Sequence, residues 1–417
     1  MPKREFITYD NGLKHVHYHV PFMKSVLLDF YVGFGSGDEI TPDQYGIAHF
    51  LEHMLFNGSE KYPVRADTDN LVSSLGNYQN AWTWLSMTTY YQYSTKENFK
   101  QAFDILSDRV FNPILREEDV QKEIGVIQEE RLMCENDPWT SLSLEIGSRL
   151  FAPTPLSHPT IGTESSIGGM TSSGLRDLHQ KGYHPSNVWF VTYGGMSLNE
   201  ISAIVSSTFK ESGGSVRYDH QKITLPSVSG ESKIEIKRDI DLSIYMLDLS
   251  VPPVESIEEL AALTVFETLL GSGNGSRFMD EFMLKSSLSS AAEFGVYLHR
   301  NGVIMGANIN CEPKDQEKVQ KLTRKYLVDL DFSFGSDDVD RASKFTYGNL
   351  IRSIEEVGFL SSSGLQNLEL MNFLNGSDHD LDMLQEAIRS VGVREIKKLI
   401  NWIGDNASWI DGVAVPN

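Results

Sequence analysis

Two histidines four residues apart set the strongest limit on the structure of this chain. They are His49 and His53, with Glu52 between them, in a stretch from residue 45 to 55 where apolar residues recur at spacings of three and four. This period is typical of a helix with one wide apolar face. Residues four apart on a helix share a face, so both imidazoles can reach one metal ion, with Glu52 on the same side. The alternative is an amphipathic helix that carries two histidines by chance, but their burial would then require other polar partners.

Two imidazoles do not complete a catalytic zinc site, which usually has three protein ligands and an open position. A second predicted helix, over residues 117–136, offers Glu123, Glu129 and Glu130. Glu123 and Glu130 are seven residues apart and share a face, whereas Glu129 points elsewhere. One of the first two could complete the zinc shell, and the other could hydrogen-bond a ligating histidine. The alternative is that these acids are solvent-exposed residues of a charged helix.

Composition excludes several classes of function. The chain has 417 residues and a net charge of −21, which argues against a nucleic-acid-binding protein and disfavours binding to an anionic membrane. An acidic protein can instead attract cationic ligands, including basic peptides. No apolar stretch is long enough to span a membrane, and the N-terminus lacks the apolar core of a secretory signal. With only two cysteines, far apart in sequence, we expect a reducing compartment and a cytoplasmic location.

The order of predicted elements indicates two domains. Each half begins with strands and continues with helices, a strand and further helices, which predicts two similar α+β domains. The best candidate for a linker is a stretch rich in glycine, serine and proline. We therefore expect a first domain over residues 1–212, a linker over 213–232 and a second domain over 233–417.

Several segments together carry a resemblance to a known family. They are residues 35–39, 46–59, 80–83, 123–130, 161–163, 184–187 and 271–277. The chain resembles the pitrilysin-type inverzincin zinc metallopeptidases, which include insulin-degrading enzyme and the mitochondrial processing peptidase. The resemblance spans most of the chain and implies two α/β-sandwich domains, each a mixed sheet with helices packed on one side, related by pseudo-two-fold symmetry.

The resemblance also implies roles for individual residues. His49, His53 and Glu130 would bind Zn²⁺, Glu52 would be the general base and Glu123 the supporting acid of the second block. An extended peptide substrate would bind by strand addition to the segment formed by Asn80, Ala81, Trp82 and Thr83. The implied activity is that of a zinc endopeptidase that cleaves unfolded peptides inside a dimeric chamber.

The second half departs from the family pattern. Active members carry an arginine and a tyrosine seven positions apart after the glycine-rich turn, and these help to hold the substrate carbonyl. The matching positions here are Met283 and Ser290, which cannot do so. We therefore expect a heterodimer with a homologous companion subunit that supplies the missing pair.

Two other interpretations remain open. The chain could be a non-catalytic structural or peptide-binding subunit of a peptidase-like complex, although the complete set of ligands and Glu52 favours an enzyme. Zinc could also be purely structural, but a closed structural site does not need a free base such as Glu52. Separately, His15, His17 and His19 share one face of a predicted strand, where a polar strand face is a simpler interpretation than a surface metal site.

Overall fold

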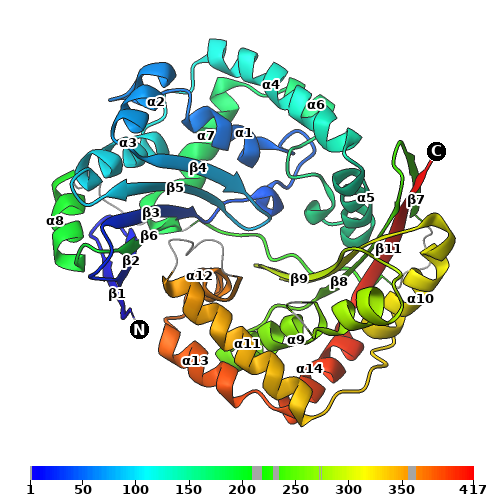
Figure 1. Ribbon diagram of the computed structural model, residues 1–417. Coiled ribbons are helices and arrows are strands. Elements are labelled where there is room, and N and C mark those ends of the chain that lie inside the picture. The colour runs from blue at the N-terminus through cyan, green and yellow to red at the C-terminus, as the bar shows by residue number, and fades with distance from the viewer. Residues whose placement is uncertain (1, 209–217, 229–233, 272, 274, 356–362) are drawn as a thin grey trace. The chain divides into compact units, whose positions relative to one another are not determined.

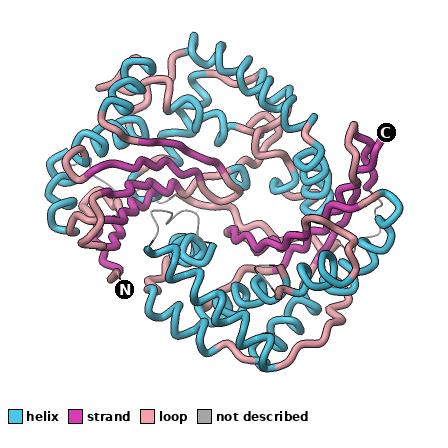
Figure 2. The backbone as a smooth tube through the Cα atoms, in the orientation of Figure 1, coloured by secondary structure: helices cyan, strands magenta, loops and turns pink. Residues whose placement is uncertain are grey.

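The computed structural model describes residues 2–208, 218–228, 234–271, 273, 275–355 and 363–417 (Figure 1). Its contacts divide the chain into two compact units, which Figure 2 shows as two groups of strands with their helices. The first unit comprises Met1–Met133 and His158–Gln221, and the second Cys134–Ser157 and Lys222–Asn417. None of the described helices is both long enough and apolar enough to cross a membrane.

The first unit is built on a six-stranded mixed sheet with the strand order β1-β2-β6-β3-β5-β4. Only β2 and β6 are parallel neighbours, and β4 forms one edge of the sheet. The strands are β1 (Arg4–Thr8), β2 (Lys14–His19), β3 (Ser25–Val32), β4 (Tyr78–Thr83), β5 (Thr88–Thr95) and β6 (Val188–Gly194). The helices are α1 (Ile47–Leu55), α2 (Arg65–Ser74), α3 (Phe99–Phe111), α4 (Glu117–Asn136), α6 (Glu164–Gly168), α7 (Ser172–Gly182) and α8 (Leu198–Thr208).

Aromatic side chains join the sheet of the first unit to α3. Phe30 of β3 stacks on Phe190 of β6 with ring centroids 4.7 Å apart, and Phe103 of α3 lies 5.2 Å from the same ring. All three are fully buried. Packing of this kind fixes the sheet against its helices, and the sheet in turn carries the edge strand β4 next to α1.

The second unit is also built on a mixed sheet. This sheet has five strands in the order β7-β11-β8-β10-β9, and of these only β7 and β11 are parallel neighbours. The strands are β7 (Ile234–Arg238), β8 (Ser243–Val251), β9 (Ala292–His299), β10 (Gly302–Cys311) and β11 (Ser408–Pro416). The helices are α5 (Pro138–Phe151), α9 (Ile257–Leu270), α10 (Gln316–Leu327), α11 (Ser336–Glu355), α12 (Ser363–Asn375), α13 (Leu381–Ser390) and α14 (Val393–Asn406). Two mixed-sheet α+β domains are thus confirmed.

The boundary between the two units differs from the one expected from the sequence. We expected the first domain to run unbroken to residue 212, whereas Cys134–Ser157 groups with the second unit. The reason is α5, whose buried residues Leu142, Ile146 and Leu150 form one apolar stripe and which packs on β8 and β11. Of the expected linker, residues 213–217 and 229–232 lie outside the described residues, and residues 218–228 form no helix or strand.

The start of α1 is fixed by a glycine and a buried carboxylate. Gly46 has a φ of 88°, so the helix begins at Ile47 and not at residue 45 as the apolar pattern suggested. A Cβ atom on Gly46 would lie 2.5 Å from the carbonyl oxygen of Ile161. The fully buried Glu39 accepts hydrogen bonds from the backbone N–H groups of Gly46 (2.7 Å) and Ala48 (2.8 Å). These contacts satisfy N–H groups that a helix N-terminus leaves free, and they hold α1 in place.

We expect Gly46→Ala to destabilise the protein by more than about 1 kcal/mol, because the left-handed backbone alone costs an L-residue about that much and the contact with Ile161 adds to it. Urea unfolding would measure the loss. The matched control is Gly125→Ala, inside α4, where an added Cβ meets nothing within 4 Å and should stabilise the helix slightly. Equal unfolding midpoints for Gly46→Ala and the natural chain would contradict this account of the start of α1.

Candidate metal centre

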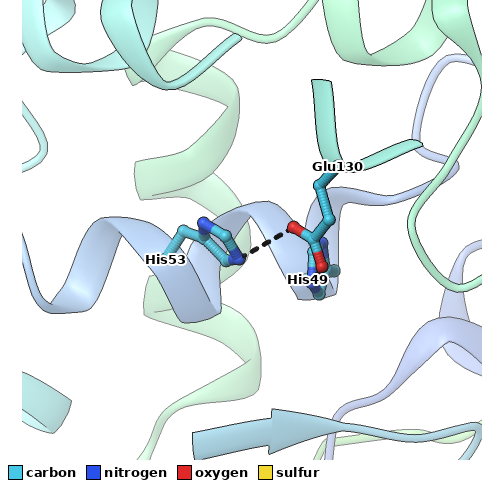
Figure 3. Close-up of side chains that lie close together, drawn as sticks. All are labelled: His49, His53 and Glu130. Carbon is cyan, nitrogen blue, oxygen red and sulfur yellow. Dashed lines mark ion pairs between the residues drawn. The ribbon is translucent and has the colours of Figure 1, made fainter. Parts of the chain in front are cut away.

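Helix α1 and helix α4 bring the three predicted metal ligands together. The rings of His49 and His53 lie on one side of α1 with centroids 4.6 Å apart, and Glu130 reaches them from α4 (Figure 3). The Nε2 atom of His49 is 3.7 Å from one carboxylate oxygen of Glu130, and Nε2 of His53 is 3.5 Å from the other. One donor atom from each residue lies within 4.8 Å of the other two. In the described part of the chain, this is the one such cluster of metal-binding side chains.

The chemistry of these side chains fits a zinc ion. Two imidazole nitrogens and one carboxylate oxygen are a usual ligand set for zinc in catalytic sites. Burial, and next the neighbouring His53, lowers the pKa of His49 to about 3, so its ring is neutral and has a lone pair to offer. The Nδ1 atom of His49 is buried and makes no hydrogen bond within the described residues. In the neutral ring of His49, the tautomer with its proton on Nδ1 has its lone pair on Nε2. That Nε2 atom is the one that lies near Glu130.

Glu123 lies behind His53. One of its carboxylate oxygens is 2.9 Å from Nδ1 of His53, and the other accepts a hydrogen bond of 2.9 Å from the side-chain amide of Asn57. Burial acts to raise the pKa of Glu123, but these two hydrogen bonds hold that pKa below its usual value. For His53, burial acts to lower the pKa, and the bond to Glu123 and nearby carboxylates raise it overall. Glu123 is thus an ionised carboxylate that orients the ring of His53.

Glu52 has a different environment, on the side of α1 that faces β4. The residue is 9% exposed, and one carboxylate oxygen (Oε2) accepts a hydrogen bond of 2.6 Å from the hydroxyl of Thr83. Burial raises the pKa of Glu52 although the bond from Thr83 opposes this. A carboxyl group with a raised pKa is better suited to exchange a proton near neutral pH.

The predicted peptide-binding segment forms most of β4, and its side chains divide between two faces. Ala81 and Thr83 lie on one face, and Asn80 and Trp82 on the other, as strand geometry requires. Because β4 is an edge strand, one side of its backbone has no strand partner in the described sheet. Thr83 contacts Glu52 directly, so its side chain serves the candidate base in addition to any peptide.

A pocket of about 290 Å³ opens beside Glu52. It is lined by Glu52, His53, Phe56, Arg65, Asp69 and Gln79 among others. Arg65, Asp69 and Asn57 did not emerge from the sequence as candidates. Their only signals were the i, i+4 spacing of Arg65 and Asp69 and the position of Asn57 one turn after His53.

We expect Asn57→Ala to weaken zinc binding by about tenfold, because residues that hold a ligand's hydrogen-bond partner in place typically contribute 10- to 100-fold to metal affinity. The substitution removes the amide that positions the Glu123 carboxylate. Competition against a chromophoric chelator would measure the affinity. If Glu123→Gln weakens binding and Asn57→Ala does not, Glu123 needs no support from Asn57.

Other residues singled out from the sequence lie away from this centre. His15 and His17 are fully buried on β2, where each ring lies 2.8 Å from the hydroxyl of Thr192 and His15 also packs against Phe190, so this face of the strand lies in the interior. In the second unit, Met283 is half-buried in the short helix η4 (Met279–Lys285), and Ser290 is exposed after it. Neither position presents a guanidinium or phenol group.

Comparisons with known proteins cover nearly the whole chain. Residues 16–164 match the family described as Insulinase (Peptidase family M16), and residues 170–344 match Peptidase M16 inactive domain. An uncharacterized zinc protease of Streptomyces coelicolor is 26% identical over 85% of this chain and 78% of that protein. Another from Bacillus subtilis is 23% identical over 94% and 93%.

Solved structures show the same fold. A protease from Helicobacter pylori superimposes with a TM-score of 0.86 at 19% identity and covers 99% of both chains. The periplasmic protease PqqL of Escherichia coli has a TM-score of 0.73 at 19% identity, and the match covers 98% of this chain but 47% of that longer one. Together with the two matched regions, which span most of the sequence, these similarities establish that the chain belongs to peptidase family M16.

Proposed function

We propose that this chain is the zinc-bearing subunit of an endopeptidase that cleaves unfolded peptides inside a dimeric chamber. The observation that carries the proposal is the convergence of His49, His53 and Glu130 on one point, with Glu52 on the same helix and an open pocket beside it. The names of relatives as zinc proteases support the same chemistry.

The three ligands would hold the zinc ion, which, when bound, makes water more acidic and polarises a peptide carbonyl. Glu52 is the group that accepts the proton of the attacking water. Because Thr83 occupies Oε2 of Glu52, the other oxygen, Oε1, is the one available for that proton. The same carboxyl group can then return the proton to the leaving amine. Glu123 takes no proton in this scheme and keeps His53 in position through Nδ1.

The free edge of β4 provides the means to hold a peptide of varied sequence. A substrate strand that pairs with the β4 backbone would be bound through main-chain hydrogen bonds, which do not depend on its side chains. Ala81 lies on the same face of β4 as Thr83, and Thr83 contacts Glu52. The strand thus places an extended chain next to the candidate base.

A related companion chain would supply the arginine and tyrosine that are absent at Met283 and Ser290. The structural match to about half of the longer E. coli protease supports a working unit that contains two such halves. The second candidate function, a non-catalytic peptide-binding subunit, is favoured only by this same absence. The complete ligand set and Glu52 support the enzyme.

The test is peptide cleavage by the purified chain alone and together with candidate companion chains, before and after removal of zinc with a chelator. We expect weak cleavage by the chain alone, strong cleavage with its companion, and loss of both on chelation with recovery on adding zinc. Full activity of the solitary chain would contradict the need for a companion. Absence of chelator-sensitive cleavage in every combination would support the binding subunit.

A further inference from the structure

The pocket beside Glu52 has a charge pattern that the metal centre does not require. Besides Glu52 and His53, its charged lining residues are Arg65 and Asp69, both from α2. A third charge, the guanidinium of Arg109 from α3, contacts Asp69 from a position where only 2% of its side chain is exposed. These three side chains carry a net charge of +1, and an ionised Glu52 offsets it, so the positive charge of the pocket is local to Arg65.

Asp69 is already neutralised by the protein. Its Oδ1 atom lies 2.9 Å from Nη2 of Arg109 and also accepts a hydrogen bond of 3.3 Å from the side chain of Gln79. Arg109 in turn donates to Gln79 at 2.7 Å. Because Arg109 is buried, separating it from Asp69 would leave an uncompensated charge without water, so this pair persists. Asp69 is therefore a poor partner for a basic side chain of a ligand.

Arg65 is the charge that remains available. Its side chain is 56% exposed and lies on the pocket, held by a bond of 3.0 Å from Nη1 to Asn57 and by a looser approach of 3.5 Å from Nε to Asp69. Its Nη2 atom makes no hydrogen bond or ion pair within the residues that the structure describes. A guanidinium fixed on one side with free N–H groups on the other is well suited to bind a carboxylate.

The geometry of β4 indicates which side chain of a bound peptide would lie near Arg65. Gln79, which lines the pocket, lies on the same face of β4 as Thr83, and Thr83 contacts Glu52. In a peptide paired with β4, every second side chain lies on that face. One of them must lie close to the bond that Glu52 acts on and at the mouth of the pocket.

We propose that this pocket is a substrate subsite for an acidic side chain next to the cleaved bond, and that Arg65 is the residue that selects it. The inference rests on the proposed peptidase function and adds a specificity to it. It concerns one position only. The net charge of −21 on the whole chain favours basic peptides in general, whereas the guanidinium of Arg65 acts on the single side chain that enters the pocket.

The test uses peptides in which one Glu or one Lys is moved along an otherwise neutral sequence, with cleavage sites mapped by mass spectrometry. For the natural chain with its zinc and companion, we expect kcat/KM to favour Glu over Lys by about tenfold or more at one position beside the cleaved bond. The ratio should fall to about 1 in Arg65→Met and favour Lys in Arg65→Glu. Because a ratio between substrates is measured, a general loss of activity through Asn57 and Glu123 cancels. Lys181→Glu, at an exposed position on α7, is the charge-matched control and should keep the natural ratio.

Binding of the same peptides to the zinc-free Glu52→Gln chain, measured by fluorescence anisotropy, separates this inference from the proposed function. If the natural chain with its zinc and companion cleaves none of the peptides, while the zinc-free Glu52→Gln chain binds with a preference for Glu that Arg65→Glu reverses, the subsite is supported and the peptidase is overturned. Cleavage with a preference for Lys or for neutral side chains, or a preference for Glu that Arg65→Glu leaves unchanged, would overturn the subsite and leave the peptidase standing.

Discussion

Glu52→Gln is expected to lower peptide turnover by about 10²- to 10⁴-fold, the usual contribution of a general base, while zinc content stays at the natural level. Glutamine has the shape of glutamate, and its carbonyl oxygen can still accept the hydrogen bond from Thr83. It cannot take a proton from water. None of the three metal ligands is altered, and Glu52 is not among the side chains that converge on the metal position.

Zinc content and steady-state cleavage of one peptide, measured on the same preparations, would test this expectation. Glu60→Gln is the matched control, because Glu60 is exposed, lies soon after α1 and loses the same charge. Turnover by Glu52→Gln within a few-fold of the natural rate would refute Glu52 as the base. Loss of zinc together with turnover would instead place Glu52 among the groups that hold the metal.

The sequence predicted which side chains of α1 would meet at the candidate metal centre because the signals are local. The spacing of His49 and His53 requires only that residues 47–55 form a helix, and that helix is present. The β-branched and aromatic residues at 25–32 and 79–95 are likewise a short-range pattern that indicates strands, and the structure has β3, β4 and β5 there. Local spacing therefore determined which side chains could meet.

Spacing alone could not decide between Glu123 and Glu130. Seven residues are slightly less than two full turns of a straight helix, so the two carboxylates face α1 at slightly different angles and two turns apart along the axis. Glu123 is 8% exposed and reaches Nδ1 of His53, whereas Glu130 is 40% exposed and reaches the Nε2 atoms of both rings. The resemblance to known peptidases, not the helical pattern, assigned the ligand role to Glu130.

Sequence patterns could not predict the charged pocket, because the residues that form it come from separate helices and strands. Arg65 and Asp69 belong to α2, Gln79 to β4 and Arg109 to α3. Each of them would pass for an ordinary surface residue until the fold brings them together. The same limit applies to α5, whose apolar stripe predicts that it is buried but not which of the two sheets it covers.

Glu130→Gln should weaken zinc binding by at least about 100-fold, which is more than a substitution of a residue that only supports a ligand, such as Asn57. Supporting residues of that kind contribute about 10- to 100-fold to metal affinity. An amide oxygen carries no charge to offer a divalent cation. The fold should be unaffected, because Glu130 is partly exposed and, among the residues that the structure describes, forms ion pairs only with His49 and His53. Equal unfolding midpoints for the zinc-free natural and variant chains would separate loss of a ligand from loss of structure.

Glu129→Gln is the sharpest control for this change. It lies next to Glu130 on α4, is exposed and loses the same charge, so any effect of net charge on zinc affinity should appear in both variants. Zinc affinity that is unchanged in Glu130→Gln but reduced at least about 100-fold in Glu123→Gln would mean that the two carboxylates have exchanged roles. His53 would then have to turn its ring so that Nδ1, now 2.9 Å from Glu123, and not Nε2, faces the metal.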